Sequence, residues 1–216
     1  MFEGNITHGL EYISFREQPN FTQDIYKKKI FGFLWPLCFE YPHFKAWYNG
    51  LFVESGNLHT DREIIMCMHN VRLVGVAILK KTIAEKKICT LRVDQRYQRN
   101  GIGHELIERS LNWLEDDKPL ITVRQSKAYQ FQKLFEYFGF KLEQKYPMYY
   151  TFLGIEQVYN GELANSGSII YNKIEHINLY NVLSMLIRKD EVIDTDALIR
   201  AIVYYEQQRA RGFVPA

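Results

Sequence analysis

The chain has 216 residues, of which 47% are apolar and 24% charged, a composition typical of folded globular proteins that excludes a disordered chain. Its 27 basic and 25 acidic residues give a net charge of +2, which is too small to indicate by itself a protein that binds duplex DNA. Aromatic residues make up 15% of the chain, so we expect a thick core, a broad binding face or both.

The beginning of the chain lacks a basic segment followed by an apolar run, so the sequence predicts no signal peptide. The longest apolar run, 30–39, contains a proline and falls short of the roughly 20 residues that span a bilayer. Cys38, Cys67 and Cys89 show no CxxC spacing and are predicted to be buried free thiols in a reducing compartment. We therefore expect a soluble, cytoplasmic protein that makes no use of a membrane.

The first elements along the chain are a strand over 10–17 and a helical pattern over 23–53. Pro36 and Pro42 should break this helical stretch into at least two pieces, since proline lacks the backbone N–H that a helix interior requires. Most of the eight aromatic residues between 31 and 48 are assigned to core packing, and one or two of them are candidates for shaping a binding pocket.

The middle of the chain predicts three strands followed by a helix. Strands over 63–69 and 72–81 are joined by a tight bend at Asn70, and 88–93 has no polar alternation, which indicates a central strand. Apolar residues with a 3.6-residue period then predict a helix over 101–115.

The remaining elements complete an alternating α/β pattern. A strand over 119–125 precedes a helix over 128–138 that should stop at Gly139, and strands follow over 141–150 and 154–159. The predicted order is β-α-α-β-β-β-α-β-α-β-β. Because strand–helix–strand units join parallel strands, at least part of the sheet should be parallel, with helices covering it.

Only helical patterns follow residue 172. Two amphipathic helices are predicted over 177–188 and about 194–212, and the segment NSGS at 165–168 is the best candidate for a linker. The prediction is therefore a domain over 1–165 and a C-terminal helical hairpin over 166–216. The hairpin should bury its apolar face against the domain, and homodimerisation through these helices is the alternative.

The loop after the central strand carries the pattern that most strongly indicates a ligand. The strand is predicted to end at Val93, and residues 98–103 (QRNGIG) lead into the helix. Helix N-termini expose unpaired N–H groups and the positive end of the helix dipole, which together bind anions. Glycines at 101 and 103 would let a diphosphate approach the backbone. Three basic residues stand near the same point: Arg96, Arg99 and His104.

A structural explanation of the same pattern is that both glycines only let the helix enter tightly against the sheet. Two other phosphate motifs do not fit. A P-loop requires Gly-Lys-Ser/Thr, which is absent, and the dinucleotide fingerprint requires a third glycine where Leu106 stands.

At this point the chain resembles the GNAT superfamily of acetyl-CoA-dependent N-acetyltransferases. The resemblance rests on 93–107 (VDQRYQRNGIGHELI) as that family's QxxGxG acyl-CoA motif, with 72–81 as the preceding strand and 134–140 (LFEYFGF) as the late helix that ends in Gly-Phe. It implies a GNAT-like α/β (α+β) fold, in which helices flank a mixed, centrally splayed β-sheet. Residues 165–216 have no counterpart in the family core.

The resemblance also implies the activity and the site. Acetyl-CoA would be the co-substrate, and its acetyl group would pass directly to a primary amine in a ternary complex, without a covalent enzyme intermediate. The splayed strand edge would hold the pantetheine arm, and the amides of the loop would hold the pyrophosphate. The residues expected to bind the co-substrate are Leu91, Arg92, Val93, Gln98, Arg99, Asn100, Gly101, Ile102, Gly103 and His104.

The sequence departs from the family in its proton-transfer groups. Phe135 stands where many members carry a tyrosine that protonates the departing thiolate, and its helix face indicates core packing. Strand 88–93 lacks the carboxylate that often serves as base, with Cys89 and Thr90 in its place. Glu63 is a candidate base, although a solvated or structural role explains it better. The catalytic acid and base therefore stay unassigned.

The acceptor amine is equally open: a small molecule, a protein or an aminoacyl-tRNA would suit the resemblance. Because the usual acid and base are missing, a catalytically weak or inactive acetyl-CoA-binding regulatory or partner-binding module is the alternative function. The six histidines have no HxxxH or HxH spacing, so no metal site is expected.

Overall fold

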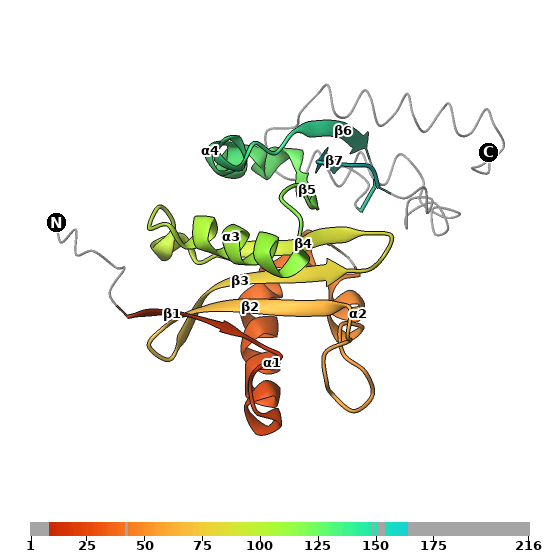
Figure 1. Cartoon of the computed structure of the whole chain (residues 1–216). Helices are drawn as coiled ribbons and strands as arrows, with labels where there is room; N and C mark the ends of the chain where they lie inside the picture. The colour runs from red at the N-terminus through yellow and green to blue at the C-terminus, as the bar shows by residue number, and fades with distance from the viewer. Residues whose placement is uncertain (1–8, 42, 148, 151–153, 164–216) are drawn as a thin grey trace, which may run out of the picture.

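The computed structural model describes residues 9–41, 43–147, 149–150 and 154–163. Helices and strands follow one another in the order that the sequence predicts (Figure 1). The predicted C-terminal hairpin and the domain boundary near residue 165 lie outside the described residues. Across the described part of the chain, no helix has the length and apolarity needed to cross a bilayer.

The N-terminal half contains four strands and two helices. They are β1 (Leu10–Ser14), α1 (Asn20–Leu34), α2 (Phe44–Asn49), β2 (Arg62–His69), β3 (Arg72–Lys81) and β4 (Lys86–Val93). The short 3-10 helix η1 (Trp35–Phe39) lies between α1 and α2.

The described residues beyond β4 add two helices and three strands. They are α3 (Ile102–Leu114), β5 (Leu120–Arg124), α4 (Ala128–Phe138), β6 (Leu142–Pro147) and β7 (Ile155–Tyr159). Two further 3-10 helices, η2 (Gln95–Tyr97) and η3 (Gln125–Lys127), precede α3 and α4.

The first helix begins three residues earlier than predicted. Pro19 is its N-cap, and the Pro19 carbonyl accepts hydrogen bonds from the amides of Thr22 (2.8 Å) and Gln23 (3.1 Å). Proline suits this position because its fixed φ is compatible with a helix start and no N–H is needed there. The predicted break at Pro36 is confirmed, since α1 ends at Leu34 and η1 takes over.

The seven strands form one sheet in the order β1-β2-β3-β4-β5-β7-β6. Every neighbouring pair is antiparallel except β4 and β5, which are parallel because α3 crosses over between them. The prediction of a mixed sheet with 88–93 as a central strand is confirmed.

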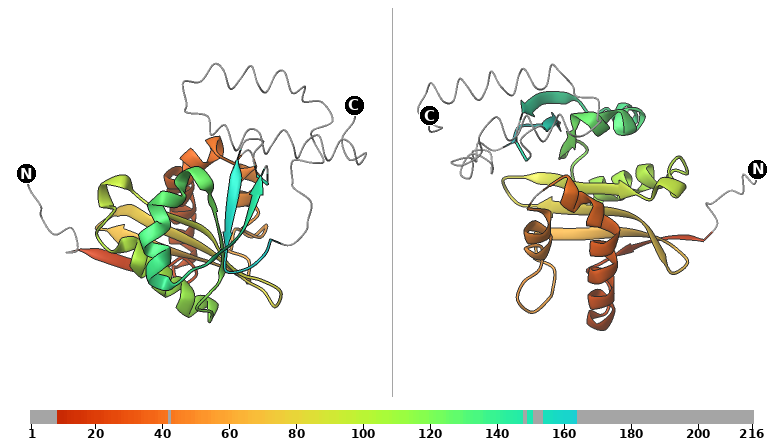
Figure 2. Two further views of the ribbon diagram at one scale, coloured as in Figure 1. Left: turned by 90° about the horizontal axis from the view of Figure 1, so that it is seen from above. Right: turned by 180° about the vertical axis from the view of Figure 1, so that it is seen from behind.

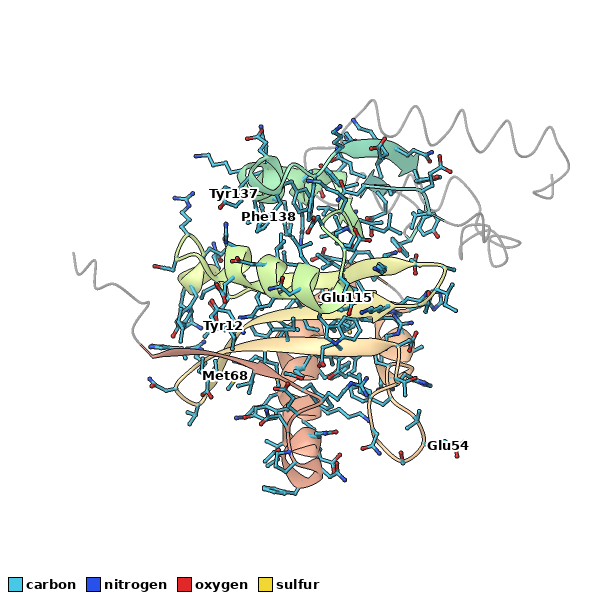
Figure 3. The ribbon with its side chains drawn as sticks, in the orientation of Figure 1. Tyr12, Glu54, Met68, Glu115, Tyr137 and Phe138 are labelled. Atoms are coloured by element: carbon cyan, nitrogen blue, oxygen red, sulfur yellow. The ribbon has the colours of Figure 1, made fainter. Side chains whose placement is uncertain are left out.

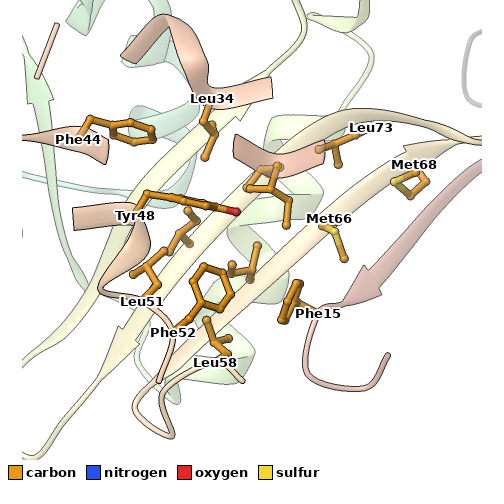
Figure 4. Close-up of a cluster of buried hydrophobic side chains, with 14 residues drawn as sticks. Phe15, Leu34, Phe44, Tyr48, Leu51, Phe52, Leu58, Met66, Met68 and Leu73 are labelled. Carbon is orange, nitrogen blue, oxygen red and sulfur yellow. The ribbon is translucent and has the colours of Figure 1, made fainter. Parts of the chain in front are cut away.

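Two layers of helices cover the sheet, α1 and α2 on one face and α3 and α4 on the other (Figure 2). The core under α1 and α2 is rich in aromatic residues, and the Phe52 ring contacts those of both Phe15 and Tyr48 (Figure 4). The buried Tyr48 hydroxyl donates a hydrogen bond to the Lys27 carbonyl at 2.8 Å. Most of the aromatic residues in this stretch therefore pack in the core, as expected.

The core under α3 and α4 is mainly aliphatic and depends on a close approach of α3 to β3. A side chain at Gly75 of β3 would place its Cβ 3.0 Å from Ile102 and 3.1 Å from Leu106, both on α3. Glycine therefore sets the distance between this helix and the sheet.

The three cysteines are free thiols, as predicted. Cys67 is buried in the sheet, whereas Cys38 and Cys89 are only partly buried. Cys89 lies at a β-bulge of β4, where the register against β3 shifts between Ile78 and Leu79.

Candidate active site

The two central strands separate along their length. β4 and β5 pair only at Lys87 with Leu120 and at Ile88 with Ile121. Beyond these pairs β4 stays with β3, and β5 stays with β7, so the β5-facing edge of β4 has no strand partner among the described residues. The predicted central splay is confirmed, and it opens toward the carboxyl ends of both strands.

The exposed edge of β4 presents backbone groups to this opening. The Asp94 amide donates to the Val74 carbonyl of β3 at 2.8 Å. Because residues alternate in an antiparallel ladder, the N–H and C=O groups of Arg92 also face β3, while those of Leu91 and Val93 face the splay. The Val93 carbonyl there accepts a hydrogen bond from Gln98 Nε2 at 3.3 Å.

The loop that leaves β4 places a row of amides at the start of α3. Arg99 and Gly101 have positive φ values of 64° and 77°, and the Glu105 amide donates to the Gly101 carbonyl at 3.0 Å. The amides from 99 to 104 donate to no acceptor in the described parts of the chain. They form the anion-binding arrangement that the sequence predicts for a helix N-terminus.

Side-chain hydrogen bonds hold the loop in this shape. Asn100 Nδ2 donates to the carbonyls of Tyr97 (3.3 Å) and Gln98 (3.0 Å). A Cβ at Gly101 would meet nothing within 4 Å, and one at Gly103 would meet only Leu134, at 3.5 Å. Both glycines therefore border open space, and the close approach of α3 to the sheet depends on Gly75 instead.

The basic side chains predicted around this loop differ in their availability. Arg96 is turned back on Asp94, with its Nη2 3.1 Å from Asp94 Oδ2, so its charge is largely compensated. The His104 ring packs against Tyr137 (4.4 Å between centroids) and Phe138 (4.8 Å) on α4. Figure 3 shows these two aromatic residues on α4, which lies above α3 in that view.

Phe135 is buried, as its helix face predicts. Its ring contacts those of Phe131 (5.4 Å), Phe140 (5.4 Å) and Tyr159 (4.6 Å). The position has only 2% of its surface exposed, and it offers no proton to a bound ligand.

Glu63 has a structural role. Its carboxylate accepts hydrogen bonds from Ser14 Oγ (3.0 Å) and the Ile64 amide (2.8 Å), and Arg16 Nε lies 4.0 Å away. It lies on β2, with β3 between it and β4, and is 4% exposed. Because the side chain is buried, the alternative of a solvated role is wrong. Burial raises the pKa of this carboxyl, although the hydrogen bonds act in the opposite direction.

A second buried carboxylate, Glu156 of β7, was not predicted as a functional residue. It pairs across the sheet with Arg124 at the end of β5, on the open side of the splay. Only 2% of the residue is exposed, and its Oε2 has no hydrogen-bond partner among the described residues. The sequence of β7 (IEQVY) gives no sign that its acidic residue is buried.

The connection between α1 and α2 reaches across to this second half of the sheet. Glu40 accepts a short hydrogen bond from Lys127 Nζ in η3. Next to it, the Tyr41 ring lies edge-on against Tyr150, with 5.5 Å between centroids. These contacts bring the α1–α2 connection next to η3 and Tyr150, and they bring Tyr41 near Glu156.

A separate open pocket of about 500 Å³ lies at the opposite end of β5, where β4 and β5 are still paired. It is lined by Lys118, Lys141, Glu143 and Glu162, among others. The pocket lies away from the splay and from the free amides, so we do not include it in the candidate site. Among the described residues, no three His, Cys, Asp or Glu side chains are grouped to hold a metal ion.

Comparison with known proteins identifies the family. The family described as "Acetyltransferase (GNAT) domain" matches residues 46–147, from α2 to the end of β6. This stretch contains the splayed strand and the free amides. Residues 46–147 therefore match a GNAT acetyltransferase domain, and acetyl transfer is the general activity to which that domain points.

Solved structures with a similar fold include a GNAT family acetyltransferase from Elizabethkingia anophelis with acetyl-CoA bound. It is 14% identical, covers 73% of this chain and 100% of its own, and gives a TM-score of 0.49. The ribosomal-protein-S18-alanine N-acetyltransferase from Escherichia coli is 21% identical over 52% of this chain and 77% of its own, with a TM-score of 0.42. A search of curated proteins finds no match.

Proposed function

We propose that this protein transfers the acetyl group of acetyl-CoA to a primary amine by direct attack in a ternary complex. The observation that carries the proposal is the position of the splay: the free edge of β4 opens beside the row of unbonded amides at the start of α3. A ligand with an anionic diphosphate and a linear amide-containing arm matches both features at once.

The residues present fit coenzyme A. A diphosphate at the amides of 99–104 would satisfy N–H groups that have no described acceptor and would sit at the positive end of the α3 dipole. The pantetheine arm would extend along Leu91 and Val93 as an added strand does, through backbone hydrogen bonds. The proposed binding residues are Leu91, Arg92, Val93, Gln98, Arg99, Asn100, Gly101, Ile102, Gly103 and His104.

The chemistry then depends mainly on positioning. The nitrogen of the neutral amine attacks the thioester carbonyl carbon, a C–N bond forms and the C–S bond breaks. The products are an acetamide and the coenzyme A thiol, and one proton of the original ammonium goes to solvent. An N–H of the β4 edge is suited to polarise the carbonyl oxygen while this occurs.

The test is acetyl transfer by the purified protein to a panel of small polyamines, peptides with free N-termini and lysine-containing peptides, with thiol release and product mass as readouts. We expect release of one thiol for each acetylated amine. Binding of acetyl-CoA without turnover on any amine would instead support the regulatory alternative.

The loop assignment has its own test in Gly103→Tyr. A Cβ at Gly103 would make only an ordinary contact with Leu134, at 3.5 Å, so the bulky side chain should be tolerated by the fold and should block the diphosphate position. We expect the increase in melting temperature caused by acetyl-CoA to disappear, since a ligand that no longer binds the folded state no longer stabilises it. The control is Gly32→Tyr on α1, which also points into open space and should keep the increase; an unchanged shift in Gly103→Tyr would contradict the assignment.

A further inference from the structure

Glu156 is a buried carboxylate with an unmet requirement for hydrogen bonds. The residue is 2% exposed, and Oε2 has no partner among the described residues. Leaving one oxygen of a buried carboxylate unpaired costs stability, so such groups in native proteins call for an explanation. Glu63, the other buried glutamate, is by contrast held by a serine hydroxyl, a backbone amide and an arginine.

The position of Glu156 places it at the splay. Its cross-strand neighbour Arg124 ends β5, where that strand has already left β4. Glu156 lies on β7, with β5 between it and β4, and the positive charges of Arg124 on β5 and Lys87 on β4 both act on its carboxyl. Tyr41 and Glu40 face it from the connection between α1 and α2.

Tyrosine hydroxyls surround the same carboxyl. Burial raises the pKa of Tyr41 and of Tyr150, and the nearby Glu156 charge raises both further. Both phenols therefore stay protonated at neutral pH and can donate hydrogen bonds. A hydrogen bond with Thr122 of β5 lowers the pKa of Tyr150, and the charge of Cys89 on β4 raises it.

We propose that Glu156 is the general base of the acetyl transfer, accepting on Oε2 the proton that the acceptor ammonium must lose before its nitrogen can attack. This inference rests on the proposed function. A general base acts within hydrogen-bond reach of the proton or across one water. The proton leaves the N–H bond, its electron pair stays on nitrogen for the new C–N bond, and the carboxyl later returns the proton to solvent. Tyr41 is a positioning residue that orients the carboxylate.

The electrostatics of the position suit this role. Burial raises the pKa of Glu156 to about 7, while Arg124, Lys87 and the Tyr41 hydroxyl act in the opposite direction and Glu40 adds to the increase. The charge of Glu40 is offset by its ion pair with Lys127. A base with a pKa near the working pH combines a usable ionised fraction with enough basicity to take the proton.

The experiment compares Glu156→Gln with the matched control Glu63→Gln, using the most reactive amine of the panel and acetyl-CoA. Glu156→Gln keeps the side-chain volume, so the melting-temperature increase with acetyl-CoA should be retained. Its kcat should fall by about 10²–10⁴-fold, the usual contribution of a general base. Glu63→Gln should lower the melting temperature and leave the pH dependence of kcat unchanged.

A second measurement does not depend on the folding of Glu156→Gln. In the wild type, kcat should rise with pH through an inflection near 7. Tyr41→Phe should move this inflection to higher pH, because the Tyr41 hydroxyl lowers the pKa of Glu156. A purely structural carboxylate would produce no such shift.

The outcomes separate the two proposals. If the wild type acetylates no amine, the proposed function fails and Glu156 has no reaction to serve. If the wild type is active and Glu156→Gln keeps its kcat and pH profile, the base assignment is overturned while the acetyltransferase function stands. An unchanged inflection in Tyr41→Phe overturns the assignment as well.

Discussion

Phe135 shows how one residue distinguishes this chain from many members of its family. At the position where others carry a tyrosine, its ring is enclosed by Phe131, Phe140 and Tyr159. The aromatic stripe on α4 was enough to predict this burial from the sequence, because residues three to four apart share a helix face. Phe135 itself therefore has no hydroxyl and almost no exposed surface with which to take part in proton transfer.

We expect Phe135→Ala to lower the free energy of unfolding by about 3–5 kcal/mol, since it removes a buried ring and leaves a cavity. Urea denaturation would measure the loss. Tyr129→Ala on the same helix is the control, because Tyr129 is 73% exposed and its loss should stay within about 0.5 kcal/mol. Equal losses in the two variants would show that Phe135 is not a core residue.

Glu156 shows what the sequence could not reveal at this scale. In a strand of five residues, the pattern of polar and apolar residues does not reveal whether an acidic side chain is buried. The role of Glu156 also depends on neighbours from β4, β5 and the α1–α2 connection. Those neighbours come from segments as far away as Glu40 and Tyr41. Only the folded arrangement brings them together.

Among the elements, α3 links the fold to the candidate site. Its N-terminus supplies the free amides, and its first turn packs on β3 where Gly75 leaves room for Ile102 and Leu106. Hydrophobic periodicity and the glycine pattern predicted the helix and its ligand role. The sequence pattern did not show that α3 approaches the sheet most closely at Gly75, because this contact joins residues of β3 and α3 that lie far apart in the sequence.

We expect Gly75→Ala to destabilise the protein by about 1–3 kcal/mol, because the new Cβ would lie 3.0–3.2 Å from Ile102, Leu106 and Cys67 in a packed core. The same displacement of α3 should weaken acetyl-CoA binding. Calorimetric titration and thermal melting would measure both effects. Gly32→Ala on α1 is the control and should stabilise the protein by up to about 1 kcal/mol; unchanged stability and binding in Gly75→Ala would contradict this account of the helix position.

At the scale of the whole molecule, element order and sheet class followed from alternating β and α patterns, and the structure confirms them. Boundaries were less predictable, because capping by a residue such as Pro19 extends a helix beyond its apolar period. The antiparallel order in which β7 lies between β5 and β6 was also not predicted. That order places Glu156 beside Arg124, and so it decides the composition of the candidate site.

The stability of the whole protein should depend on pH through Glu156. Its pKa is raised from 4.5 to about 7 in the folded state, so the folded protein binds the proton more tightly than the unfolded chain does. The stability contribution is fully present below about pH 4.5 and is lost as pH rises through about 7, a decrease on the order of 3 kcal/mol.

The measurement is the difference in unfolding free energy between wild type and Glu156→Gln from pH 4 to pH 8. Taking the difference removes the contributions of other titrating groups, including Glu63. We expect the wild type to lose stability relative to the variant as pH rises. Parallel curves would show that the Glu156 pKa is ordinary in the folded state.

The short seam between β4 and β5 has a consequence for cooperativity. Only two registered residue pairs, at 87–120 and 88–121, join the backbone of β1–β4 to that of β5–β7. Backbone amides on either side of the seam should therefore exchange with deuterium in two groups, each opening as its own unit with its own free energy. A ligand that lies in the splay and contacts both halves of the sheet should couple their opening. With coenzyme bound, we therefore expect the amides of both halves to exchange as one cooperative unit.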